Sequence, residues 1–347
     1  MPLEFREAFL SKKIMIDEEK TIPFSEVLDK VFNAEPIPVH LLFHLSDMEP
    51  EDAGRFNQAW AKADEERRRV ITRHLADMVE EAYFVDFSPI FKLGIEDESP
   101  QVRMAALDGL WDSTDTMFVT PLITLLQSDP SLEVRVAAAK ALAHYVLLAE
   151  WGQMPLRVSR PIIEALLAVY EMDETAVPIK RAALEGLGAA AHPRVEELIS
   201  EAYNSKFQDM RVSAVFAMGN SADDRWLTTI LAEIESSDDE MQLEAIRAAG
   251  AMGRSDAVEL LADMIEDDTS DVRAAVIVAL GKIGGDIPQA ILARLMDDPD
   301  HEDMHELIEE TIEEMLLLGG EIDIIEYMEG ENLLPDDMYV DEDEEEL

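Results

Sequence analysis

The string His301-Glu302-Asp303-Met304-His305 has the clearest chemical potential in this sequence, because it matches the HExxH pattern of zinc hydrolases. On a helix, this spacing places two imidazoles one turn apart and leaves the glutamate free to act as a general base. The residues within and after the motif are charged rather than apolar, however, and the preceding Asp297-Asp298-Pro299-Asp300 predicts a turn that leaves His301 at or before the helix start. A metal hydrolase is therefore only a remote alternative.

A second histidine pair, His40 and His44, lies four residues apart in the apolar segment from Val39 to Leu45, with Asp47 just beyond it. This spacing could hold a metal on a helix, but packed or half-exposed histidines fit so apolar a segment better. The chain contains no Cys, which excludes disulfides and thiolate chemistry. We therefore predict no catalytic residues, no metal ligands, no cofactor and no enzymatic activity.

The chain is organised by a recurring pattern. An apolar residue is followed by a second residue that is usually basic, and small or apolar residues stand three, six and seven places after the second residue. Most copies are 31 or 32 residues apart, and one step measures 45. Such a period predicts stacked structural repeats. The copies begin at Val102-Arg103, Val134-Arg135, Ile179-Lys180, Met210-Arg211, Met241-Gln242, Val272-Arg273 and, in degenerate form, Met304-His305.

Each repeat unit reads as a pair of helices, and no alternating strand pattern competes with this reading. We predict an all-α fold, a right-handed α-solenoid of about seven stacked antiparallel helix pairs over residues 86–330. Residues 1–85 are expected to form an irregular helical cap that covers the apolar end of the stack. Residues 331–347 form an acidic tail without basic residues, which is expected to be disordered.

The basic residue of the motif has a structural explanation. Arg103 and Arg135 follow Asp97 and Asp129 by six residues, and Arg273 follows Asp267 in the same way. Each carboxylate would lie at the start of the first helix, where it can cap the helix or accept from an arginine of its own or the next repeat. We predict a ladder of ion pairs that holds the repeats in register.

The period near 31 and the D-x₅-R-x₂-A-x₂-A-L-G pattern resemble the short HEAT-like repeats of phycobilin lyases and bacterial scaffold proteins. The resemblance covers about residues 86–330, and it implies mainly protein binding. An accessory or lyase-type protein that handles a small-molecule ligand or a bilin is the alternative, although no bilin pocket is indicated. A HEAT-like di-iron hydroxylase has His-Glu pairs just after the basic residue of the motif in several repeats. This chain has pairs such as Met104-Ala105 and Val136-Ala137 there, so it does not fit that class of enzyme.

The charge balance restricts the possible partners. The chain has 28 Lys and Arg against 76 Asp and Glu, a net charge of −48, and no basic stripe that could bind nucleic-acid phosphates directly. It has no apolar run long enough to span a membrane, and the start MPLEFREAFLSKK resembles neither a signal peptide nor an anchor. We expect a cytoplasmic monomer that does not insert into membranes.

Two surfaces are candidate binding sites for another protein. The long step adds residues near 146–160, where Trp151, Arg157 and Arg160 are residue types that interfaces favour, although a longer helix pair with a plain loop would also explain it. The second helices are expected to line the concave side and to form an acidic groove for a basic or amphipathic segment, although a solvated face is the simpler explanation. The carboxylates concerned are Glu197, Glu201, Glu233, Glu259 and Asp263.

Overall fold

The computed structural model describes residues 22–81, 85–265 and 269–319, and every regular element in these ranges is a helix. The all-α prediction is therefore confirmed. The chain divides into two compact units, Met1–Ala190 and Ala191–Leu347, which are described separately. The acidic tail at 331–347 lies outside the described residues. No helix in the described ranges is both long and apolar enough to cross a bilayer.

The first unit begins with three elements outside the repeat and continues as helix pairs. α6 packs against α4 and α8, and α8 packs against α10, so that successive motif helices are neighbours. The elements are α2 (Phe24–Asn33), η1 (Val39–Leu45), α3 (Pro50–Trp60), α4 (Glu65–Glu81), α5 (Ser88–Ile95), α6 (Pro100–Asp108), η2 (Thr116–Phe118), α7 (Val119–Ser128), α8 (Leu132–Glu150), α9 (Leu156–Glu171) and α10 (Val177–Leu187).

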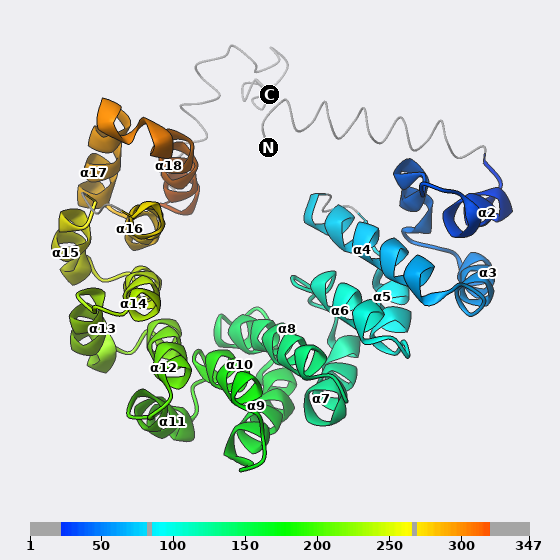
Figure 1. Cartoon of the computed structure of the whole chain (residues 1–347), viewed down its shortest axis with the longest axis horizontal. Coiled ribbons are helices and arrows are strands. Elements are labelled where there is room, and N and C mark those ends of the chain that lie inside the picture. Colours follow the sequence, from blue (N-terminus) through cyan, green and yellow to red (C-terminus); the bar gives the residue numbers. More distant parts are fainter. Residues whose placement is uncertain (1–21, 82–84, 266–268, 320–347) are drawn as a thin grey trace, which may run out of the picture. The chain divides into compact units, whose positions relative to one another are not determined.

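The second unit has two layers (Figure 1). The motif helices α12, α14, α16 and α18 pack one against the next, and the second helices α11, α13, α15 and α17 form the other layer. The elements are α11 (Pro193–Tyr203), α12 (Gln208–Ser221), η3 (Asp224–Trp226), α13 (Leu227–Ile234), α14 (Asp239–Met252), η4 (Ser255–Ala257), α15 (Val258–Asp263), α16 (Ser270–Ile283), α17 (Asp286–Met296), η5 (Pro299–Met304) and α18 (His305–Gly319).

Glycines in the motif allow neighbouring motif helices to approach to backbone contact. A Cβ atom added to Gly219 would lie 2.7 Å from the Cα of Ala248, and one added to Gly250 would lie 2.8 Å from the Cα of Ala279. Real Cβ atoms do not approach backbone this closely. The small residues that recur in the sequence are therefore explained by helix packing.

A ladder of ion pairs is present, but each aspartate accepts from the arginine of the preceding repeat and not, as predicted, from that of its own or the next repeat. Arg103 Nη2 lies 2.8 Å from Asp129 Oδ1, and Arg273 Nη2 lies 2.9 Å from Asp303 Oδ2. Arg135 departs from the pattern, because its Nε donates to the carbonyl of Leu126.

The ladder also begins earlier than residue 86. Arg68 of α4 donates from Nε to Asp97 Oδ2 at 2.7 Å, so that α4 is tied to the next repeat in the same way as α6. Asp97 in turn accepts from the backbone N–H of Ser99 at 2.9 Å, just before α6 begins. Asp267, the third predicted aspartate, lies outside the described residues.

The extra residues of the 45-residue step lengthen two helices rather than form a separate element. α8 has 19 residues and α9 has 16, compared with 9 and 10 in the preceding pair α6 and α7. A short turn at residues 151–155 joins the two long helices. The insertion is thus a longer helix pair, and whether its turn binds a partner stays a prediction.

Candidate protein-binding surfaces

The acidic surface of the second helices is partly neutralised within the protein. Glu197 Oε2 and Glu201 Oε1 both bind Nη1 of Arg194, at 2.5 and 3.1 Å. These three residues share one face of α11, and both carboxylates remain more than half exposed. A partner could therefore still reach them, although in competition with Arg194.

Glu233 already makes a contact within the protein. The hydroxyl of Tyr203 on α11 donates to Glu233 Oε1 on α13, which ties two successive second helices together. Burial of the phenol and the hydrogen bond to Glu233 raise the pKa of Tyr203 to about 12. Glu233 is half-buried and stays a predicted binding residue, one whose Oε1 already accepts from a tyrosine 30 residues away.

Glu259 and Asp263 on α15 are the two predicted carboxylates that remain exposed and form no ion pair within the described ranges. In the second unit, Figure 1 shows α15 on the outer side of the motif helices. This arrangement differs from the predicted one, in which the second helices line the inner side. Gly219 and Gly250 allow the motif helices on the other side of this unit to approach closely.

The α8–α9 turn exposes an aromatic side chain, and two exposed cations follow it along the chain. Trp151, the residue after α8, is 64% exposed, and Arg157 and Arg160 in the first turns of α9 are exposed as well. Met154 is instead buried and packs the turn onto the body of the unit. The structure therefore brings Trp151, Arg157 and Arg160 into one short region, as their spacing in the sequence suggested.

The HExxH residues do not form the helical pair of a zinc site. His301 has a non-helical backbone, with φ −114° and ψ 20°, and α18 begins only at His305. His301 is buried, and its Nδ1 lies 3.4 Å from Asp298 Oδ2. Within the described residues, no group of three or more His, Cys, Asp or Glu side chains could hold a metal ion. The prediction that His301 precedes the helix is confirmed.

His40 and His44 lie on a 3₁₀ helix, η1, rather than on an α-helix. With about three residues per turn, positions four apart point in different directions. His40 is exposed and His44 is half-buried. The two imidazoles therefore do not share a face, contrary to what α-helical spacing would imply.

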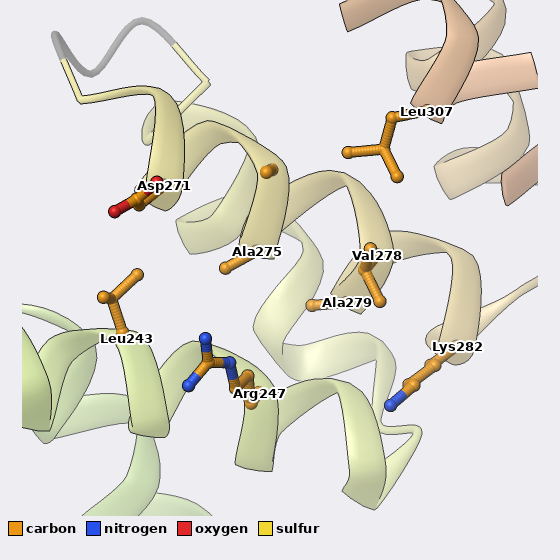
Figure 2. Close-up of a pocket in the computed structure, with 9 residues that line it drawn as sticks. Leu243, Arg247, Asp271, Ala275, Val278, Ala279, Lys282 and Leu307 are labelled. Carbon is orange, nitrogen blue, oxygen red and sulfur yellow. The ribbon is translucent and has the colours of Figure 1, made fainter. Parts of the chain in front are cut away.

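A groove on the layer of motif helices was not predicted from the sequence. It has a volume of about 330 Å³ and lies between α14 and α16, with Leu307 of α18 at its edge. Figure 2 shows Leu243 and Arg247 on α14 facing Ala275 and Val278 on α16. Three of the α16 residues that line the hollow are small: Ala274, Ala275 and Ala279.

The rim of this groove is charged at both ends of α16. Asp271 lies in the first turn, and Lys282 lies near the last turn, about 16 Å further along the axis. Arg247 stands over the apolar floor, and its only ion pair within the described ranges is a loose one to Glu244 at 3.7 Å. Arg247 and Val278 each follow the basic or polar position of their repeat by five residues, and this shared offset is the signal that could have located the groove.

Comparison with known proteins identifies HEAT repeats in both units. A model described as HEAT repeats matches residues 225–313, and a model of a single HEAT repeat matches residues 118–147. A comparison with curated protein sequences finds no match. The chain therefore contains HEAT repeats, in agreement with the resemblance inferred from its period.

Several solved structures are similar to the chain in fold. The Escherichia coli protein YibA is 17% identical, with 79% of this chain and 95% of YibA covered and a TM-score of 0.41. Human deoxyhypusine hydroxylase is also 17% identical, over 78% of this chain and 98% of the hydroxylase, with a TM-score of 0.32. Yeast importin-β is 13% identical, over 84% of this chain and 46% of importin-β, with a TM-score of 0.46.

Proposed function

We propose that this HEAT-repeat chain is a non-enzymatic scaffold that binds another protein through its second unit. The observation that carries the proposal is the open groove between α14 and α16, which combines an apolar floor with a charged rim. Binding surfaces commonly have this composition, an apolar centre surrounded by polar groups. The proposed partner element is an amphipathic helix or a similar segment.

The dimensions of the groove suit one face of a helix. Leu243, Val278 and Leu307 offer apolar contact from three successive motif helices. An amphipathic helix places apolar side chains at three- and four-residue spacing and can insert them between such ridges. The binding energy would come mainly from the apolar area that is removed from water, at about 25 cal/mol per Å².

The charges at the rim would orient the bound segment. Arg247 and Lys282 favour carboxylates at one end, and Asp271 favours a cation at the other. Charge complementarity of this kind contributes more to orientation and association rate than to affinity. The partner segment should therefore carry opposite charges at its two ends.

The Ala275→Phe variant tests the groove, because a phenyl ring would fill the hollow without adding charge. The matched control is Ala290→Phe, at an exposed position of α17 outside the groove. Proteins retained by the full chain at low salt would be identified by mass spectrometry, and their affinity would then be measured. We expect Ala275→Phe to weaken binding at least tenfold and Ala290→Phe to leave it unchanged.

Two results would contradict the proposal. One is the absence of any retained protein at low salt, and the other is equal affinity of the Ala275→Phe variant and the unmodified chain. Circular dichroism and thermal unfolding of both variants would show that a loss of binding is not a loss of folding.

The outer acidic surface of α15 is a second candidate, favoured by the exposed carboxylates of Glu259 and Asp263. A basic partner segment would bind there, with an affinity that falls as salt screens the charges. Replacing both residues by Lys should abolish that binding while leaving binding at the groove intact. Unchanged affinity for every retained partner would rule out this surface.

A further inference from the structure

Arg157 and Arg160 are unusual among the arginines of this acidic chain. Most described arginines bind a carboxylate or a backbone carbonyl, as Arg68, Arg103 and Arg135 do. Within the described ranges, Arg157 and Arg160 have neither an ion pair nor a hydrogen bond through their side chains, although acidic residues outnumber basic ones by 76 to 28. Their guanidinium groups are therefore available to a partner.

The local structure reinforces the positive charge at this position. Arg157 and Arg160 lie three residues apart and share a face of α9. The first turn of α9 contains no acidic residue, whereas α4 and α14 each have two there. The free N–H groups at a helix N-terminus carry a partial positive charge. The start of α9 therefore combines this partial charge with the full charges of Arg157 and Arg160.

Two large exposed apolar side chains lie close to these cations along the chain. Trp151 is 64% exposed and Leu156 is 62% exposed. Leu156 precedes Arg160 by four residues, so that the two share a face of the helix. Exposed tryptophan and leucine beside arginine form a typical composition for the centre of a protein interface.

The turn that presents Trp151 is held in place by its own backbone. Gln153 and Met154 both donate from their N–H groups to the carbonyl of Leu148, at 2.9 and 3.2 Å. Gly152 has a φ of +73°, which a residue with a side chain rarely adopts, and Met154 is buried beneath the turn. A partner would therefore meet a preorganised surface, which reduces the entropy lost on binding.

We propose that the α8–α9 turn docks an acidic segment of a partner protein. An apolar side chain of that segment covers Trp151 and Leu156, and its carboxylates bind Arg157 and Arg160. This site is separate from the groove of the second unit and does not depend on it. A nucleic acid fits less well, because Arg157 and Arg160 are two cations only, whereas the sequence has no basic stripe that could follow a phosphate backbone.

A defined peptide can test this proposal on the full chain. The probe is a fluorescently labelled synthetic peptide of glutamates interrupted by two Leu-Phe pairs, and its counterpart has lysines in place of the glutamates. Anisotropy titrations should show binding of the acidic peptide only. We expect Arg157→Glu with Arg160→Glu to weaken it at least tenfold, and Trp151→Ala to weaken it several-fold.

The matched control is Arg294→Glu on α17. Arg294 is the third described arginine without a side-chain partner, and it belongs to a helix of the second unit, whereas the turn belongs to the first. This variant should bind the acidic peptide as the unmodified chain does, and so should Ala275→Phe, which alters only the groove. Circular dichroism of each variant would verify folding.

The proposal is overturned if the acidic peptide does not bind, or if the double arginine variant binds it equally well. It is also overturned if the lysine peptide or a single-stranded oligonucleotide binds more tightly than the acidic peptide. None of these results would affect the groove, because the test with Ala275→Phe uses a different partner and a different surface.

Discussion

Nη2 of Arg103 lies 2.8 Å from Oδ1 of Asp129, and both side chains are almost fully buried, at 8% and 4% exposure. Arg103 also donates from Nη1 to the carbonyls of Asp97 and Glu98, at 2.8 and 3.1 Å. One guanidinium group therefore donates to two backbone carbonyls before its own helix and also binds a carboxylate of the next repeat. This geometry transmits the register of one repeat to its neighbour.

The Arg103→Ala variant should be strongly destabilised, because it would leave the buried carboxylate of Asp129 without its cation. Removing one partner of a buried pair costs about 3–5 kcal/mol. Chemical denaturation would measure the free energy of unfolding, and a double-mutant cycle with Asp129→Ala would isolate the pair. Arg55→Ala, which breaks half-exposed pairs on α3, should cost about 1 kcal/mol or less. Similar losses for both arginines would contradict the role of the ladder.

The Gly219→Ala variant should also be destabilised. A methyl group would lie 2.7 Å from the Cα of Ala248, and overpacking of this kind costs about 1–3 kcal/mol. Gly54→Ala on α3 is the matched control, because nothing lies within 4 Å of its added Cβ. In that helix, alanine should stabilise the protein by about 0.5–1 kcal/mol. Thermal unfolding should thus shift in opposite directions for the two substitutions.

The Tyr203–Glu233 contact should make stability sensitive to alkaline pH. Burial and the hydrogen bond raise the pKa of Tyr203 from the ordinary value of 10 to about 12. The folded state holds this proton more tightly than the unfolded state, so the stabilising contribution is complete below pH 10 and is lost between pH 10 and 12. The free energy of unfolding should fall more steeply over this range in the unmodified chain than in Tyr203→Phe. Parallel curves would contradict the contact.

The purified full chain should contain no stoichiometric zinc. The non-helical backbone at His301 prevents the one-turn arrangement of two imidazoles on which an HExxH site depends. Elemental analysis would measure the metal content after purification without chelators. Stoichiometric zinc that disappears in a His305→Ala variant would revive the hydrolase alternative.

The repeat and its packing were predictable because they depend on residues that recur at a fixed step. The period, the small residues at Gly219 and Gly250, and the ladder residues Arg103 and Asp129 all follow from the sequence. Arg68 was missed because Arg67 stands where the motif normally has an apolar residue. Its contact with Asp97 appears only when α4 and α6 are seen side by side.

The candidate surfaces were less predictable, because exposure and pairing depend on neighbouring repeats. The sequence marked Trp151, Arg157 and Arg160, which are close together along the chain and remain together in the structure. It could not separate Glu233 from Glu259, since the two differ only in whether a tyrosine of the preceding repeat reaches them. The groove was also missed, because it is a space between two helices and its one signal in the sequence was the offset that Arg247 and Val278 share.

The amino-acid sequence by itself determined the helix-pair repeat, the close approach of its helices and the strong negative charge, because period, residue size and charge are local properties of the chain. Only the tertiary structure decided which layer faces outward, which carboxylates are already engaged and where the groove lies. Those properties arise between residues about one repeat apart, where distance and direction in space, rather than residue type, determine which groups meet.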